Sequence, residues 1–287
     1  MVMGIQSSMD NALACEARAP KVGKAEIWPA FLIFFRPKPL HKTTMDKKPK
    51  NLPDLADFSH VTEWVFDLDN TLYPHHINLF SQIDRNMTAY VAELLQLDTD
   101  EARALQKRYY HEHGTTLQGL MIHYGISPDE FLERAHAIDY SALQPHPELG
   151  DAIKALPGRK FILTNGSVKH AQAAAGALGI LDNFEDIFDI VAAGYLPKPA
   201  SATYEKFAAL AKLDTKRAAM FEDLPRNLAA PKTLGMKTVL LVPSNLEGVI
   251  MERWEIPAET DEHIDYITDN LTGFLTGLTT DKPAPAK

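Results

Sequence analysis

Short apolar segments alternate with longer amphipathic segments over most of the chain. Five runs rich in β-branched and aromatic residues are too short for stable helices and are bounded by turn-forming residues; they span 63–67, 160–164, 186–193, 218–222 and 237–242. Helical patterns follow the later runs, at 167–178, 200–212 and 226–234. Such alternation, with almost continuously apolar strands, is typical of a parallel sheet buried between helices. The pattern therefore predicts an α/β fold with a Rossmann-like parallel sheet covered by helices on both faces.

The connection between the first two predicted strands is too long for a simple crossover, because structureless loops beyond about 15 residues are uncommon. Its pattern is helical. Residues 79–95 carry an apolar stripe, 98–113 begin with the N-cap pair Asp98 and Glu101, and 127–138 begin with Ser127 and a proline. We therefore predict an inserted α-helical cap at 74–145, an α/β core at 53–73 and 146–272, and disordered tails at 1–52 and 273–287.

Polar side chains follow the predicted strands at the point where each strand ends. The set comprises Asp67 and Asp69, Thr164 and Asn165, Lys198, and Glu222 and Asp223. Taken singly, each has an ordinary explanation as part of a turn, a loop or a helix cap. However, the carboxyl ends of parallel strands meet at one edge of a sheet, where ligands bind in open α/β folds. Their shared position therefore indicates a site.

The residue types in this set favour phosphoryl chemistry. Several neighbouring carboxylates need a hard cation, and an all-oxygen ligand set suits Mg²⁺. A lysine, a hydroxyl group and the backbone N–H groups after Asn165, at the start of a helix, suit a dianionic phosphoryl group. One aspartate could attack phosphorus and form an aspartyl-phosphate. The other, two residues further on, could protonate the leaving oxygen and then activate water.

Four motifs in this chain resemble those of the haloacid dehalogenase superfamily, in the same order. They are "DLDNTL" (67–72), "LTNG" (163–166), Lys198 and "FEDLPRN" (221–227). The resemblance extends from Thr62 to about Val242, and the insertion after the first motif is similar to the helical cap of that superfamily. Within it, "DLDNTLYP" and "HGTTLQGLM" (113–121) look like the pyrimidine 5′-nucleotidase branch, which hydrolyses nucleoside monophosphates such as UMP and CMP.

The resemblance implies a role for each motif residue. Asp67 would be the nucleophile and Asp69 the general acid/base. Thr164, Asn165 and Lys198 would surround the phosphate. Mg²⁺ would be held by Asp67, the backbone carbonyl of Asp69, and Asp223 with Glu222. A flap over the site would include Tyr73 to His76, and Tyr73, Thr115 and Thr116 are the candidate specificity residues.

Composition narrows the class of partner. A net charge of −9 and a pI near 5.6 argue against an extended nucleic-acid surface. The single cysteine, Cys15, allows no intrachain disulfide and no cysteine-based zinc site. The apolar run 27–35 is too short to span a bilayer and lacks the features of a signal peptide. We therefore expect a cytoplasmic enzyme that acts on a small phosphorylated metabolite, without a nucleic-acid or membrane partner; the oligomeric state stays open.

Several other activities use related motifs. A haloalkanoate dehalogenase needs no metal and usually lacks the second aspartate, so Asp69 argues against it. A phosphonatase needs an amine in the cap, and Lys107 is the only lysine between Asp67 and Lys154. A lysine on a helix face is more often solvated, so this activity is disfavoured. A phosphomutase, or a phosphatase for another small metabolite, would carry the same four motifs and stays an alternative. A non-catalytic regulatory protein is disfavoured because all four motifs are intact.

Overall fold

The computed structural model of the protein describes residues 55–244 and 261–279. The predicted tail at 1–52 and residues 280–287 of the second tail lie outside these ranges. A six-stranded sheet with the order β3-β2-β1-β4-β5-β6 forms the centre, and every strand pair is parallel. The strands are β1 (Glu63–Phe66), β2 (Arg159–Leu163), β3 (Asp186–Phe188), β4 (Ala218–Glu222), β5 (Lys237–Leu241) and β6 (Tyr266–Thr268). The predicted α/β class is confirmed.

The five predicted strands are all present, with two differences. β3 ends at Phe188, whereas the apolar pattern continues to Ala193, because Ile190 to Ala193 form turns after the strand. β6 was not predicted, since its short sequence "YIT" has no pattern distinct from that of a loop. It pairs in parallel with β5, with Val239 opposite Tyr266.

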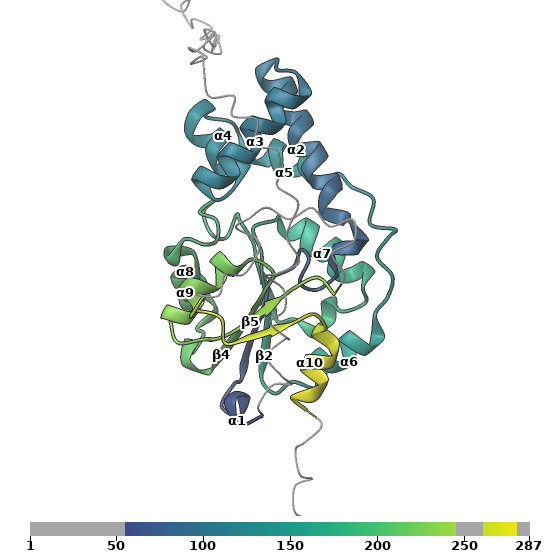
Figure 1. The fold of residues 1–287 in the computed structure, drawn as a ribbon, viewed down its shortest axis with the longest axis vertical. Coiled ribbons are helices and arrows are strands. Elements are labelled where there is room, and N and C mark those ends of the chain that lie inside the picture. The colour runs from purple at the N-terminus through teal and green to yellow at the C-terminus, as the bar shows by residue number, and fades with distance from the viewer. Residues whose placement is uncertain (1–54, 245–260, 280–287) are drawn as a thin grey trace, which may run out of the picture. The chain divides into compact units, whose positions relative to one another are not determined.

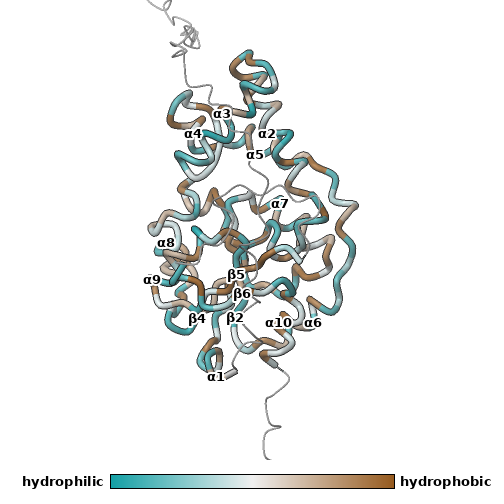
Figure 2. The backbone as a smooth tube through the Cα atoms, viewed as in Figure 1, coloured by the Kyte–Doolittle hydropathy of each residue, from teal (hydrophilic) through white to brown (hydrophobic). Residues whose placement is uncertain are grey.

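Helices cover both faces of the sheet (Figure 1). They are α1 (Leu55–Phe58), α6 (Pro147–Ala155), α7 (Val168–Ala177), α8 (Ser201–Ala211), α9 (Ala229–Thr233) and α10 (Leu271–Gly277), with short 3-10 turns at His75–Ile77, Leu181–Asn183, Thr215–Arg217 and Pro225–Leu228. Alternate residues of β1 point to opposite faces: Trp64 and Phe66 pack with α6, α7 and α10, whereas Val65 packs with α8 and α9. The strands are mostly apolar along their length (Figure 2), as burial on both faces requires.

Between β1 and α6, the helix that precedes β2, lie the four helices α2 (Leu79–Leu95), α3 (Thr99–His113), α4 (Thr116–Tyr124) and α5 (Pro128–Ala135). They form their own apolar cluster, which also takes in Ile190 from the loop after β3. The start of α3 is stabilised by the expected capping box, in which Asp98 accepts from the N–H of Glu101 and the Glu101 side chain accepts from the N–H of Asp98. Among the described residues, no helix combines the length and the apolar character needed to cross a bilayer.

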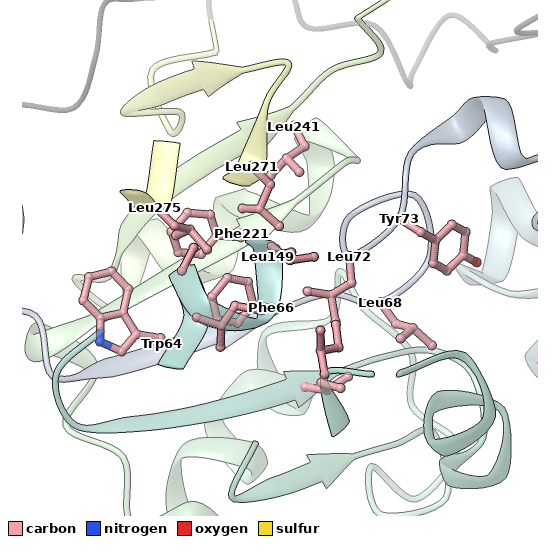
Figure 3. Packing of buried hydrophobic residues seen from close by; sticks show 14 of the residues in the cluster. Trp64, Phe66, Leu68, Leu72, Tyr73, Leu149, Phe221, Leu241, Leu271 and Leu275 are labelled. Carbon is pink, nitrogen blue, oxygen red and sulfur yellow. The ribbon is translucent and has the colours of Figure 1, made fainter. Parts of the chain in front are cut away.

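Helix α10 extends past residue 272, where the predicted core ends. Phe274, Leu275 and Leu278 are buried against the sheet, and the Phe274 ring lies edge-on to Phe221 at 5.9 Å. Figure 3 shows Leu275 beside Phe221. The sequence "LTGFLTG" contains two glycines and therefore has low intrinsic helix propensity. An N-cap bond from the N–H of Gly273 to Asn270 and burial of the apolar face stabilise the helix instead.

Truncation of Leu275 tests whether α10 belongs to the core. We expect Leu275→Ala to lower the free energy of unfolding by about 2–5 kcal/mol, because a fully buried side chain is replaced by a cavity. The exposed neighbour Thr276→Ala is the matched control and should change stability by less than about 1 kcal/mol. Urea denaturation would measure both. Equal effects of the two substitutions would exclude α10 from the core.

Candidate active site

Asp67 lies at the first position after β1, the central strand. Its backbone N–H donates to the carbonyl of Phe221 at 2.9 Å, which continues the β1–β4 ladder one residue past the strand and fixes the position of its Cα. The residue is buried, and its Oδ1 accepts from Lys198 Nζ at 2.5 Å. Beyond it the chain turns, and Asn70 takes a left-handed conformation with φ of 61°.

The ammonium of Lys198 is the centre of a buried charge cluster. Besides Asp67, its Nζ donates to Glu222 Oε1 at 2.7 Å and to the carbonyl of Leu163 at 3.0 Å. The side chain is 2% exposed. Thus a lysine from the loop after β3 neutralises acids from the ends of β1 and β4. The pKa of the Lys198 ammonium is raised, because attraction to Asp67 and Glu222 outweighs the effect of burial.

Asn165 holds the backbone of the lysine loop. Its Oδ1 accepts from the N–H of Lys198 at 2.8 Å, and its Nδ2 donates to the Lys198 carbonyl at 3.2 Å. The amide group predicted to surround the phosphate is therefore engaged with Lys198. Thr164 is buried, and its Oγ1 accepts from the N–H of Gly166 at 2.9 Å; its hydroxyl hydrogen meets no acceptor in the described part of the chain and can be donated to a ligand. Both residues follow β2, as the sequence predicts.

Glu222 and Asp223 differ in how their oxygens are used. Glu222 Oε1 accepts from Lys198 and from Asn227 Nδ2 at 2.6 Å, and its Oε2 accepts from the N–H of Leu224 at 2.8 Å. In the described part of the chain, Asp223 is approached by Asn70 Nδ2 at 3.4 Å, by His75 Nε2 at 3.5 Å and by the neighbouring Glu222 side chain. Asp223 is therefore the better available ligand for a cation, whereas Glu222 anchors Lys198.

The acid cluster has the composition of a site for a divalent cation. Ligand atoms of Asp67, Glu222 and Asp223 all lie within 4.8 Å of one another, and all three residues are buried. Three carboxylates face one ammonium, so the cluster carries excess negative charge. Burial raises the pKa of Asp67 to about 7, and burial together with repulsion from Glu222 and Asp67 raises the pKa of Asp223 well above its usual value. A hard cation with oxygen ligands would relieve this repulsion, so these residues fit one.

Asp69 lies in a different environment from Asp67. Its Oδ1 accepts from His170 Nε2 at 2.8 Å and from the Tyr73 hydroxyl. No donor meets Oδ2 among residues 55–244 and 261–279. Burial favours the neutral acid, but the charge of His170 and the hydrogen bonds from His170 and Tyr73 outweigh it and lower the pKa of Asp69 to about 2.

A cavity of about 90 Å³ lies between Asp69 and the cap helices. Its floor includes Asp69, Asn165 and Gly166 from the core. Its walls come from α2 to α5, from the residues just before α4 and just after α5, and from the loop after β3. They consist of Phe80, Ile83, Met87, Tyr110, Thr115, Thr116, Leu117, Phe131, Leu132, Ala135, His136 and Ile190. A mostly apolar pocket with a few polar groups beside titratable residues is the usual form of a small-molecule site.

The three candidate specificity residues differ in their positions. Thr115 and Thr116 line the cavity. Thr116 donates its hydroxyl hydrogen to the Gln106 carbonyl at 3.3 Å. Within residues 55–244 and 261–279, Thr115 only accepts, from the N–H of Gln118 at 3.1 Å. Tyr73 is buried beneath the acid and does not line the cavity; its hydroxyl donates to Asp69. The Tyr73 hydroxyl thus contacts Asp69 instead of the cavity.

Sequence reasoning missed His170, His136 and Tyr140. His170 is fully buried in α7 beside Asp69, and the other two lie in the segment that joins α5 to α6. The signal available in the sequence was a histidine one position before Ala171, on the apolar face of a helix that follows the "LTNG" motif. A buried histidine at such a place needs polar partners, but the sequence does not name them.

The fold and the acid cluster define a class: an α/β protein with its site at the carboxyl ends of parallel strands beneath an inserted helical cap. A family model described as haloacid dehalogenase-like hydrolase matches residues 65–235. The chain therefore belongs to the haloacid dehalogenase-like hydrolase family.

One curated relative is phosphate metabolism protein 8 of Saccharomyces cerevisiae, with 30% identity over 151 residues, or 48% of this chain. The match covers 46% of that protein, so the chain spans about half the length of this relative. Among solved structures, the L-2-haloacid dehalogenase of Xanthobacter autotrophicus with covalently bound chloropropionic acid has 16% identity and a TM-score of 0.49, covering 77% of this chain and 100% of that one. The magnesium-bound hydrolase YfnB of Bacillus subtilis has 14% identity and a TM-score of 0.49, covering 76% and 98%.

Binding of Mg²⁺ is expected to stabilise the folded protein. Saturation at about 100 times the dissociation constant adds about 2.7 kcal/mol, which corresponds to a rise in Tm of roughly 5–10 °C for a domain of this size. Asp223→Asn should abolish most of this rise. In EDTA, however, the same variant should be more stable than the unsubstituted protein, because one of the mutually repelling buried acids is gone. The exposed Asp151→Asn is the control and should change neither value.

The same cluster predicts a pH dependence. The pKa of Asp67 is raised to about 7, so the folded, metal-free protein keeps a proton that the unfolded chain releases near its ordinary value. The Asp67 contribution to stability in EDTA should therefore fall as the pH rises from about 4 to about 7, and Mg²⁺ should reduce that fall by favouring the ionised acids. The lowered pKa values of His75 and His136 act in the opposite sense, so the comparison is with Asp67→Asn, which should gain stability relative to the unsubstituted protein over this range. Thermal denaturation at several pH values would measure it. An Asp67→Asn variant that gains no stability relative to the unsubstituted protein over this range, both in EDTA, would contradict the assignment of the cluster.

Proposed function

We propose that the protein is a Mg²⁺-dependent phosphomonoester hydrolase that works through an aspartyl-phosphate on Asp67, and that its substrates are pyrimidine nucleoside 5′-monophosphates such as UMP and CMP. The observation that carries the reaction class is the contrast between two aspartates that are two residues apart. Asp67 belongs to the acid cluster around Lys198, which carries excess negative charge. Asp69 instead accepts hydrogen bonds from His170 and Tyr73 and lines the cavity.

The residues divide the first half of the reaction between them. Lys198 binds Oδ1 of Asp67, and the second oxygen attacks phosphorus, so that a P–O bond to Asp67 forms while the P–O bond to the leaving group breaks. Asp69 gives its proton to the leaving oxygen; the negative phosphoryl group nearby raises the pKa of this acid and favours the protonated form. When bound by Asp67, the Asp69 carbonyl and Asp223, Mg²⁺ would supply positive charge that offsets the charge on the phosphoryl oxygens.

In the second half of the reaction, Asp69 acts as a general base. It removes a proton from water, the water oxygen bonds to phosphorus, and the bond to Asp67 breaks. Inorganic phosphate leaves, and the sum is ester plus water giving alcohol plus phosphate. A phosphomutase would instead return the phosphoryl group to a sugar hydroxyl. The largely apolar cavity wall favours transfer to water, because it offers few polar groups to orient a bound phosphosugar.

The nucleotide assignment rests on the segment "HGTTLQGLM" and on the cavity that this segment lines. Thr115 has a hydroxyl hydrogen that meets no acceptor among the described residues, so it can donate to a carbonyl oxygen of a base. Phe80, Tyr110 and Phe131 add aromatic surface to the same wall. The name of the yeast relative, a protein of phosphate metabolism, agrees with a phosphatase reaction.

Removal of the nucleophile tests the reaction class. We expect Asp67→Asn to lose activity toward every phosphate ester by at least roughly 10⁴-fold, the scale seen when a covalent nucleophile is replaced. No phosphoenzyme should form in this variant, whereas Asp69→Asn should form one slowly from p-nitrophenyl phosphate. Rapid acid quenching and mass spectrometry would detect the adduct. A folded Asp67→Asn protein with near-normal turnover would refute the mechanism.

A panel of esters tests the substrate. UMP or CMP should exceed AMP, β-glucose 1-phosphate and phosphoglycolate in kcat/KM. Thr115→Val should lower kcat/KM for UMP by roughly 10-fold, as expected for one lost hydrogen bond of about 1–1.5 kcal/mol, and should change that for p-nitrophenyl phosphate much less. Thr115→Ser keeps the hydroxyl group and should behave like the unsubstituted protein. A sugar phosphate that outran UMP tenfold would overturn the nucleotide assignment but leave the reaction class intact.

A further inference from the structure

His170 occupies a position that core packing alone does not explain. The side chain is 0% exposed and lies in α7 beside Ala171 and Ala174, where an apolar residue would bury the same surface without polar groups. A buried imidazole is costly unless both ring nitrogens are hydrogen-bonded. Both are: Nε2 contacts Asp69 Oδ1 at 2.8 Å, and Nδ1 contacts the Tyr140 hydroxyl at 2.9 Å.

These contacts determine which ring nitrogen carries the hydrogen given to Asp69. An ionised carboxylate can only accept, so Nε2 must be the donor to Asp69. Tyr140 completes the set in either state of the ring, because its hydroxyl can donate to Nδ1, or accept from it while donating to the carbonyl of His136 at 3.5 Å. The bond to Asp69 is therefore present whether the ring is neutral or charged.

The environment of His170 also holds the plane of its ring. His136 stacks on it with a centroid distance of 4.6 Å and an interplanar angle of 8°. His136 is itself held by a 3.1 Å contact from Nδ1 to Ser167 Oγ, the N-cap residue of α7. His136 also lines the cavity. Because the His170 ring is fixed between α7 and His136, the hydrogen bond from its Nε2 to Asp69 has one fixed direction.

We propose that His170 is a positioning residue for Asp69: together with Tyr73 it occupies Oδ1, prevents rotation of the carboxyl group, and so presents Oδ2 to the leaving oxygen of the substrate. This inference rests on the proposed function, because it assigns Asp69 the role of general acid/base. Tyr140 and His136 act one contact further out and hold the imidazole. The connection that leads from α5 back to the core thereby contributes to the alignment of a residue at the end of β1.

Substrates with different leaving groups separate positioning from a structural role. A nucleoside leaves as a poor alkoxide and needs a proton, whereas p-nitrophenolate leaves unaided. General acid catalysis contributes typically about 10²–10⁴-fold. His170→Leu should therefore lower kcat/KM for UMP by roughly 10²-fold or more, but that for p-nitrophenyl phosphate by less than about 10-fold. Its kcat for the latter should still fall, with a burst of p-nitrophenolate, because Asp69 must also activate water.

Two further variants keep the test decisive. His170→Gln retains an N–H donor near the position of Nε2 and should recover a large part of the UMP activity. Tyr140→Phe removes only the outer bond and should show the same leaving-group selectivity with a smaller loss; it serves if His170→Leu does not fold. The exposed His60→Leu is the control and should behave like the unsubstituted protein.

The outcomes distinguish the two proposals. Equal losses for both esters in all three variants, with folded protein by circular dichroism, would overturn the positioning role and leave the proposed reaction standing. A variant without the selectivity for leaving group but with reduced Tm would assign His170 to stability alone. Failure of the unsubstituted protein to cleave any phosphomonoester would overturn the proposed function and this inference together.

Discussion

The site depends on one buried ammonium group. Lys198 Nζ lies between Asp67 and Glu222 and also donates to the carbonyl of Leu163, so a single cation joins the ends of β1, β2 and β4. Removal of one member of such a buried set leaves an uncompensated charge, which is why these groups depend on one another. Asn165 fixes the loop that carries Lys198, because its amide group bonds both the N–H and the carbonyl of that residue. Because Glu222 is engaged with this lysine, the negative charge left over in the cluster lies on Asp67 and Asp223, and these residues fit a divalent cation.

Two neighbouring aspartates acquire different chemistry from this arrangement. Asp67 continues the central strand and lies in the charged cluster, whereas the turn that follows carries Asp69 out of it toward α7. Burial among acids raises the pKa of Asp67, while donors from His170 and Tyr73 lower that of Asp69. Environments that give two carboxyl groups different pKa values are the usual basis for assigning one as nucleophile and the other as general acid/base. The same turn thus provides both proposed roles within three residues.

The cap and the core contribute different parts of the site. The core supplies the charged groups, which are buried at strand ends and held by backbone contacts. The cap supplies most of the cavity wall and has its own apolar cluster, so its surface can vary without disturbing the acids beneath. His136 and Tyr140 lie on the chain between these two parts and contact His170. In the proposed mechanism, this connection links the cap to the alignment of Asp69, and its residue His136 also lines the cavity.

Local patterns in the sequence were sufficient for the strands β1 to β5, for helices α2, α3 and α5, and for the meeting of the motif residues at one sheet edge. Hydrophobic periodicity and capping residues act over a few positions, and parallel strands necessarily bring their carboxyl ends together. Three features required the tertiary structure. His170 meets Asp69 across 101 positions of sequence, Tyr73 points beneath the acid instead of into the cavity, and α10 is helical in spite of its glycines. Each is decided by which distant groups are buried against one another, because a buried polar atom takes whichever partner the packing brings within reach, and that choice is not encoded by periodicity.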